Sequence, residues 1–156
     1  MIRCEDFNGL LLLYSSLSVP SKIEQLAELA KNNKRMNITF LCYFLLNDLD
    51  KCLDTLITSG RISEAAFFAR TYCPSKISSV IEIWRKDLEK VSRVAAQSLS
   101  DPTEYPQHFP ELAQAIKCEE MLNKYYADAA PASEYMNRMG LHEYDILENL
   151  KENPDF

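Results

Sequence analysis

Hydrophobic residues recur at helical spacing along most of this 156-residue chain. In the segment after Asp48 they fall at i, i+3, i+4, i+7 and i+8, with charged or polar residues between them: Leu49, Cys52, Leu53, Leu56 and Ile57. This spacing predicts an amphipathic helix with one apolar face. Gly60 follows where a left-handed residue commonly ends such a helix. A second helix, Ile62–Tyr72, comes after almost no linker, so the two helices are expected to be antiparallel neighbours.

Upstream of this hairpin the pattern predicts three more helices. Residues 5–17 form an apolar segment that follows an acidic pair and ends before Pro20. Ser21 and Glu24 have the spacing of a capping box, so a helix is expected to begin there and to run to about Lys31. Residues 38–46 are apolar on almost every side. Their local pattern also fits a buried strand, and the helical neighbours favour a buried helix.

Downstream, prolines set the expected helix boundaries. Pro74 ends the helix Ile62–Tyr72, and Ser75 is expected to cap the next one. The prolines of residues 101–110 force a non-helical excursion, and Pro110 is placed as the first residue of a helix that runs to residue 126. Between Pro74 and this proline-rich segment, one apolar stripe continues to about residue 99. It is predicted to form one long helix or two helices meeting near residue 87. Its residues are Ile77, Val80, Ile81, Trp84, Leu88, Val91 and Ala95.

No strand or hairpin signal remains, so the body of the chain, residues 5–126, is predicted to be all-α. Six or seven antiparallel helices in short hairpins favour an α-solenoid of the tetratricopeptide (TPR-like) kind. A compact helical bundle is the alternative, because no strict sequence repeat is visible. Residues 127–156 are predicted to form a separate acidic tail that is weakly helical or disordered, with weak helices around residues 134–139 and 143–150.

Charge and hydropathy exclude several classes of partner. The formal net charge is −6, and it comes from the tail: residues 1–126 hold 16 acidic and 15 basic side chains, and residues 127–156 hold 7 and 2. A chain without a basic stripe is not expected to bind nucleic acid or to carry a polybasic membrane anchor. The longest apolar run, residues 40–46, is far below the roughly 20 residues that a membrane-spanning helix needs. No transmembrane segment is therefore predicted.

The residue types that carry chemistry are scattered. The five cysteines form no Cys-x-x-Cys pair, and His108 and His142 stand alone, so no metal site and no cofactor is predicted. His142 and Glu143 begin like a zinc-binding His-Glu-x-x-His helix, but position 146 is an isoleucine. Without a phosphate-binding glycine loop or a nucleophile beside a base, the chain is predicted not to be an enzyme. An odd number of cysteines without a signal peptide fits a reducing, cytosolic compartment with thiols buried as small apolar groups.

The helix Ile62–Tyr72 has more apolar side chains than one buried face needs. At about 100° per residue, one arc collects Ile62, Ala65, Ala66, Phe68, Ala69, Tyr72 and Cys73, and its alanines would let another helix approach closely. Phe67 points nearly the other way. Either the next hairpin covers its ring, or another protein does, or it is simply exposed. The candidate partner-interface residues are therefore Glu64, Phe67, Arg70 and Thr71.

Several short motifs between residues 55 and 112 occur together in one known family. They are Gly60-Arg61, Glu64-Ala65-Ala66-Phe67, Ala69-Arg70-Thr71-Tyr72, Pro74-Ser75, Trp84-Arg85 and Asp101-Pro102-Thr103-Glu104-Tyr105. With residues 9–13 and 43–45 they extend the likeness over about residues 7–122. The chain resembles the beta-prime subunit family of coatomer, the coat of Golgi-derived COPI vesicles. The alpha subunit of the same coat has a related solenoid and is the less favoured match.

The resemblance implies a scaffold function. In that family two β-propellers precede an α-solenoid, and the solenoid pairs with the alpha subunit to build the cage of vesicles used in Golgi-to-ER and intra-Golgi transport. The chain is expected to be a structural segment of the C-terminal solenoid region, cytoplasmic and peripheral on Golgi membranes and COPI-coated vesicles. Its expected partners are other coatomer subunits, first of all the alpha-subunit solenoid.

The chain departs from the family pattern because it contains no propeller. In that family the propellers bind dilysine cargo signals, so cargo recognition is not assigned to any residue here. The chain fits either a piece of a longer subunit or a shortened product.

Two other functions remain as alternatives. A TPR-like peptide-binding adaptor would need several convergent basic or asparagine side chains in a concave groove, and no obvious set is present. An enzyme would need a pocket that brings His108 or His142 within hydrogen-bond reach of a cysteine or a carboxylate.

Overall fold

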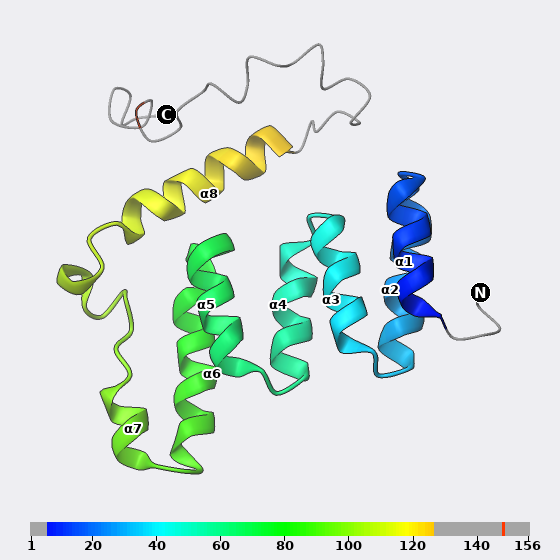
Figure 1. Cartoon of the computed structure of the whole chain (residues 1–156). Coiled ribbons are helices and arrows are strands. Elements are labelled where there is room, and N and C mark those ends of the chain that lie inside the picture. The colour runs from blue at the N-terminus through cyan, green and yellow to red at the C-terminus, as the bar shows by residue number, and fades with distance from the viewer. Residues whose placement is uncertain (1–5, 127–147, 149–156) are drawn as a thin grey trace.

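All regular structure in the described part of the chain, residues 6–126 and 148, is helical. The structure is a computed structural model, and it confirms the all-α prediction (Figure 1). The described residues hold eight α-helices where six or seven were predicted, partly because the stripe after residue 77 forms two. They are α1 (Phe7–Ser16), α2 (Pro20–Asn32), α3 (Met36–Leu45), α4 (Leu49–Thr58), α5 (Ile62–Tyr72), α6 (Ile77–Glu89), α7 (Arg93–Ser98) and α8 (Leu112–Tyr126), with the 3₁₀ turns η2 (Pro74–Lys76) and η3 (Pro106–His108).

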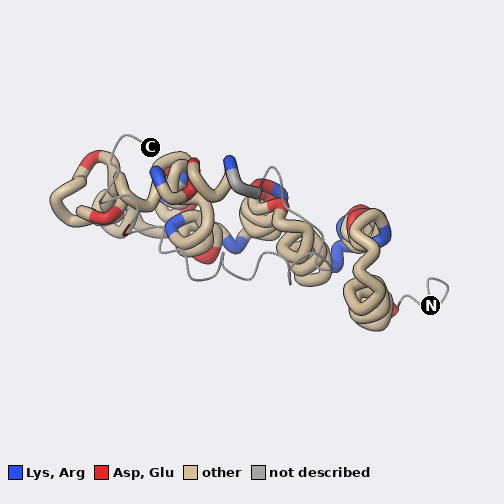
Figure 2. The backbone as a smooth tube through the Cα atoms, turned by 90° about the horizontal axis from the view of Figure 1, so that it is seen from above, with Lys and Arg blue, Asp and Glu red and all other residues tan. Residues whose placement is uncertain are grey.

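Consecutive antiparallel hairpins stack in series and give the molecule an elongated shape. Helix α2 contacts α3, α4 contacts α5, and α1 also contacts α3. The rings of Phe40 on α3 and Phe68 on α5 meet at 5.5 Å between centroids. Figure 2, seen from above, shows the helices in two staggered rows, with α1, α3 and α5 in one layer and α2, α4 and α6 in the other. The predicted TPR-like solenoid is confirmed, and the compact bundle is not what forms.

The first four helices end in the same backbone motif. After α4, Gly60 has a φ of 77°; its N–H donates to the Ile57 carbonyl at 3.0 Å, and the Arg61 N–H donates to the Leu56 carbonyl at 2.9 Å. These paired bonds define a Schellman motif, so the predicted role of Gly60 is confirmed. Helices α1, α2 and α3 end in the same way, with positive φ angles at Ser18, Lys34 and Asn47. The backbone geometry of these helix ends thus repeats, although the residue at the positive-φ position differs each time.

Glycine exchanges at these positions are expected to change stability in opposite directions. A Cβ at Gly60 would meet no heavy atom within 4 Å, so Gly60→Ala should cost only backbone strain, about 1 kcal/mol. Lys34→Gly should relieve such strain and stabilise the protein by roughly 0.5–1 kcal/mol. Urea unfolding followed by circular dichroism measures both effects. Lys86→Gly inside α6 is the control and should destabilise by about 1 kcal/mol; a destabilised Lys34→Gly protein would show that strain at this helix end is negligible.

Small side chains allow the two layers to approach closely. Ala27 and Ala30 of α2 and Ala65 and Ala69 of α5 are fully buried, which confirms the predicted alanine-centred packing face of α5. One residue of the predicted apolar arc is exposed. Tyr72 is 43% exposed, because it lies in the last turn of α5 at the surface of the layer.

Three predicted helix starts are wrong. Helix α2 begins at Pro20, because proline is favoured at the first position of a helix. Ser21 and Glu24 therefore lie inside the helix and do not form the predicted capping box. Helix α8 begins at Leu112 and not at Pro110, because residues 110 and 111 are in turn conformation. Ser75 does not cap α6, because it lies inside the turn η2.

The stripe that was predicted to reach residue 99 breaks, which confirms the two-helix alternative. The break is at residues 90–92 and not near Asp87. Ser92 starts α7, since its Oγ accepts a hydrogen bond from the Ala95 N–H at 3.3 Å. Val91 lies in the turn and is 88% exposed, so its predicted place on the buried stripe is wrong.

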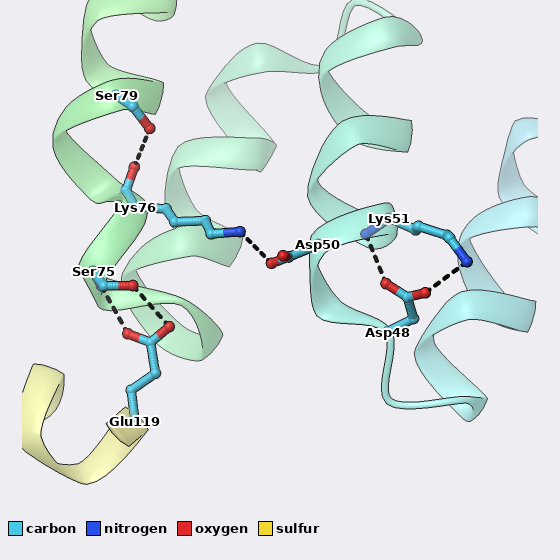
Figure 3. Close-up of polar contacts among 7 residues, drawn as sticks. All are labelled: Asp48, Asp50, Lys51, Ser75, Lys76, Ser79 and Glu119. Atoms are coloured by element: carbon cyan, nitrogen blue, oxygen red, sulfur yellow. Dashed lines mark hydrogen bonds and ion pairs between the residues drawn. The ribbon is translucent and has the colours of Figure 1, made fainter. Parts of the chain in front are cut away.

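The start of α6 is bound by side chains from two other helices (Figure 3). The N–H and the Oγ of Ser75 donate hydrogen bonds of 2.8 and 2.9 Å to the carboxylate of Glu119 on α8. The neighbouring Lys76 pairs with Asp50 of α4. A carboxylate at this end of α6 complements the positive end of the helix dipole. Helix α8 is thereby fixed across the ends of α5 and α6 (Figure 1).

The loop after α7 folds back onto α6 through one buried carboxylate. Asp101 is 5% exposed. Its Oδ1 accepts hydrogen bonds from the Ser78 hydroxyl at 2.7 Å and from the N–H and hydroxyl of Thr103 at 2.8 and 2.7 Å. Arg85 of α6 donates to the Leu99 carbonyl at 3.0 Å. The motif Asp101-Pro102-Thr103-Glu104-Tyr105 therefore holds the loop after α7 against α6.

The division of the chain at residue 126 stays a prediction. Helix α8 reaches Tyr126, the last residue before the part of the chain that the structure does not describe. The predicted weak helices at residues 134–139 and 143–150 lie outside the described residues, apart from residue 148.

Candidate protein interaction surface

The predicted interface residues of α5 are all exposed, but they do not form one cluster. The buried alanines fix the rotation of α5, so that Phe67 points outward with 62% of its surface exposed. Glu64, Phe67 and Thr71 line a common groove. Arg70 lies on the same helix, one residue before Thr71, and is not part of the lining.

This groove has a volume of about 620 Å³ and runs between α3 and α5. Its apolar residues are Phe40 and Leu41 of α3, Leu56 of α4, and Phe67 and Phe68 of α5. Phe40, Leu56 and Phe68 belong to or pack against the core. Leu41 and Phe67 are 44% and 62% exposed, so they form its two rims.

A charged network closes the groove at the N-terminal ends of α3 and α5. The Arg61 guanidinium donates to both carboxylate oxygens of Glu64, with a distance of 2.8 Å from Nε to Oε1. It also donates to the Asn37 amide oxygen of α3 at 3.2 Å. The hydrogen bond from Arg61 lowers the pKa of Glu64, against the opposing effect of desolvation. Glu64 thus stabilises the end of the groove and is not an unpaired charge.

The next hairpin contacts Phe67 without covering it. The ring of Trp84 on α6 meets the Phe67 ring edge to face, with 6.1 Å between centroids. Phe67 nevertheless keeps 62% of its surface exposed. Intramolecular stacking, one of the three explanations considered, is therefore incomplete within the described residues.

The exposed apolar side chains gather on one layer of the solenoid. Within the described helices α1 to α6, every large hydrophobic residue that is exposed lies on α1, α3 or α5: Leu12, Leu13, Leu41, Phe44, Leu45, Phe67 and Tyr72. We call the outer face of these three helices the apolar layer. It corrects the prediction that residues 38–46 are buried on all sides, because Leu41, Phe44 and Leu45 are 38–54% exposed.

Charged side chains follow the opposite distribution. Helices α1 and α3 contain no charged residue and α5 contains two, whereas α2, α4 and α6 contain four, three and five. Figure 2 shows this difference as one nearly uncoloured row of helices beside a row marked with both charges. Large exposed apolar surfaces without charge are typical of protein interaction sites.

Sequence reasoning found Phe67 and missed the residues of α3. A ten-residue helix without any charged side chain was interpreted as fully buried. In a two-layered solenoid each helix has an outer face, so the lack of charged residues on any side of α3 was itself the signal of an external contact.

The thiols of the described region do not support covalent chemistry. Cys42, Cys52 and Cys73 are at most 2% exposed, and Cys118 is partly buried. Burial raises the pKa of Cys42 to about 11, of Cys52 to about 12 and of Cys73 to about 11, so these groups stay protonated at neutral pH. This agrees with their predicted role as small buried apolar groups.

The described residues contain no group of three or more potential metal ligands. The ring of His108 stacks near Tyr105, at 6.3 Å between centroids, while His142 lies outside the described residues. No helix in the described part is both long and apolar enough to cross a membrane.

Comparison with known proteins identifies the family of the chain. The family described as COPA/B TPR domain matches residues 1–85. The chain is 43% identical over 151 residues to "Coatomer subunit beta'-1" of Oryza sativa subsp. japonica, covering 97% of this chain and 17% of that protein. It is 44% identical over 149 residues to "Coatomer subunit beta'" of Rattus norvegicus, covering 96% and 16%.

The chain thus spans about one sixth of the length of these relatives. Its similarity to them extends over almost all of its own residues, and the range that the family matches, residues 1–85, contains the helices α1 to α5. The chain therefore belongs to the COPA/B TPR domain family and is similar to a segment of coatomer subunit beta'.

Proposed function

We propose that the chain is a non-catalytic scaffold segment of the COPI vesicle coat, which acts in Golgi-to-ER and intra-Golgi transport. By this proposal it corresponds to the C-terminal solenoid region of a beta-prime subunit, and it works in the cytoplasm, peripherally on Golgi membranes and coated vesicles. Its similarity to coatomer subunit beta' supports the assignment. The observation that carries the scaffold function is the charge-poor apolar layer of α1, α3 and α5, which includes the exposed Phe67 and offers area for association.

The proposed partners are other coatomer subunits, first of all the solenoid of the alpha subunit. The proposed contact residues on α5 are Phe67, Arg70, Thr71 and Glu64. Phe67 would supply buried apolar area, and Arg70 would supply a charge that has no partner among the described residues. Arginine and aromatic residues are enriched among the side chains that dominate binding energy.

A pull-down with the alpha-subunit solenoid tests the proposed partner and the α5 contact. The wild-type chain should retain the solenoid, while Phe67→Asp and Arg70→Glu should each weaken the affinity by at least about tenfold. Glu82→Arg on the exposed surface of α6 is the matched control and should leave the affinity unchanged. Undiminished binding by both α5 variants would remove these residues from the interface, and no retention of the solenoid by the wild-type chain would exclude the alpha subunit as partner.

A further inference from the structure

The groove between α3 and α5 has the dimensions of a site for two turns of helix. Its α5 side extends from Glu64 to Thr71, which at 1.5 Å per residue is a length of about 10 Å. Phe40, Leu56 and Phe68 lie along the groove, and Leu41 and Phe67 form its rims. A helix that lies in such a groove contributes apolar side chains at i, i+3 or i+4, and i+7.

The two ends of the groove differ in charge. At the N-terminal ends of α3 and α5, Arg61 and Glu64 neutralise each other. The other end is marked by Thr71; the preceding residue, Arg70, lies outside the groove lining, is exposed, and has no ion pair or hydrogen-bond partner among the described residues. Arg70 and Glu64 are the two charged residues of α1, α3 and α5. Arg70 is therefore the one charge in these three helices that a partner can still meet.

Helix dipoles fix the direction of the occupant. Helices α3 and α5 run the same way (Figure 1), so both present their C-terminal ends, with partial negative charge, on the side of Arg70. The N-terminus of a bound helix carries partial positive charge and prefers acidic side chains in its first turn. An occupant antiparallel to α5 thus places its N-terminus at the C-terminal ends of α3 and α5, and its acidic first turn beside Arg70.

We propose that this groove binds one amphipathic helix of a partner coat subunit, antiparallel to α5, with leucine-type side chains between Leu41 and Phe67 and a carboxylate of its first turn on Arg70. The inference rests on the proposed scaffold function and adds the binding mode, the role of α3 and the chemistry of the partner helix. A strand is a poor occupant, because the groove offers no free backbone edge for pairing.

Hydrogen exchange of the whole chain, with and without the alpha-subunit solenoid, tests the location. Amides of α3 and α5 should exchange more slowly in the complex, while those of α2 and α4 should not change. If the solenoid binds and protects α2 and α4 instead, the groove proposal is wrong while the proposed function stands. If another coat subunit protects α3 and α5 and the alpha subunit does not bind, the alpha-subunit assignment fails and the groove proposal stands. If no coat subunit binds, both are wrong.

Variants of exposed residues then test the chemistry. Leu41→Ser together with Phe67→Ser should weaken binding by at least about tenfold. The matched change at Val91 and Val94, which are exposed apolar residues outside the apolar layer, should have no effect. Arg70→Lys should keep most of the affinity and Arg70→Glu should lose it, whereas Arg93→Glu on α7 should be neutral. Equal losses at the groove and control positions would overturn the proposal.

Two further outcomes would assign another occupant. Light scattering of the chain alone should show a monomer. A dimer that Leu41→Ser with Phe67→Ser makes monomeric would identify a second copy in the groove and overturn the proposal. Protection of α3 and α5 in the free chain that disappears when residues 127–156 are deleted would identify the chain's own acidic segment, with the same consequence.

Discussion

Between pH 9 and 11 the protein is expected to lose several kcal/mol of stability, because three buried thiols stay protonated in the folded state. The pKa values of Cys42, Cys52 and Cys73 are raised by burial to about 11, 12 and 11. In the unfolded chain a cysteine ionises near pH 8.5. Above that pH the folded state binds more protons than the unfolded state, so the free energy of unfolding falls as the pH rises through the folded pKa values.

The magnitude follows from the number of groups. Each thiol held protonated lowers the free energy of unfolding by about 1.4 kcal/mol per pH unit over this range. Three thiols acting together remove several kcal/mol, against a typical total of about 5–15 kcal/mol. Tyr43 adds to the effect above pH 10, because burial and its hydrogen bond to Glu28 raise the pKa of its hydroxyl.

Urea unfolding at pH 7.5, 9, 10 and 11 in the presence of a reductant measures the effect. Cys52→Ala is the informative variant, because it is less stable at pH 7.5 but should lose stability with pH less steeply than the wild type. Cys118→Ala, at a partly buried position, should change the slope least. A free energy of unfolding that is constant from pH 8.5 to pH 10.5 would mean that the thiols ionise equally well in the folded chain.

The helices of the solenoid could be predicted because their apolar spacing is a local property. The stripe Leu49, Cys52, Leu53, Leu56 and Ile57 and the terminal Gly60 contain all that α4 and its end require. The turns after α1, α2 and α3 are different. Ser18, Lys34 and Asn47 adopt the left-handed conformation without being glycine, so nothing local distinguishes them. Ser75 depends on Glu119, 44 residues away, and spacing rules contain no such information.

The candidate surface was predictable in part for the same reason. Phe67 is opposed to the alanine face on its own helix, so a helical wheel is enough to find it. The groove beside it needs the pairing of α3 with α5, and α3 has no charged residue, so a helical wheel does not show which of its sides faces outward. The order of the helices decides this, because α1, α3 and α5 share a layer and leave Leu41 and Leu45 without a covering neighbour in the described residues.

Replacing Asp101 by alanine is expected to destabilise the protein by about 3 kcal/mol. The change removes a buried carboxylate that accepts three hydrogen bonds, and it leaves the Ser78 hydroxyl and the Thr103 N–H without their acceptor. Hydrogen bonds to a charged group contribute about 1.5–3 kcal/mol each, and the exposed Thr103 recovers part of this from water. The matched control is Asp87→Ala, since Asp87 forms a surface pair with Lys90, and its effect should stay within about 0.5 kcal/mol.

The pH dependence of the Asp101 variants separates the charge from the shape of the side chain. Burial raises the pKa of Asp101, but the hydrogen bonds from Thr103 and Ser78 and the charge of Arg85 outweigh it, so the pKa lies below its usual 3.8. The stabilisation is therefore fully present above pH 4 and is lost as the pH falls through the folded pKa. Asp101→Asn should be less stable than the wild type at pH 7, and the difference should shrink as the pH falls below about 4. A difference that stays constant from pH 7 to pH 3 would show that the hydrogen bonds, and not the ionised carboxylate, hold the loop against α6.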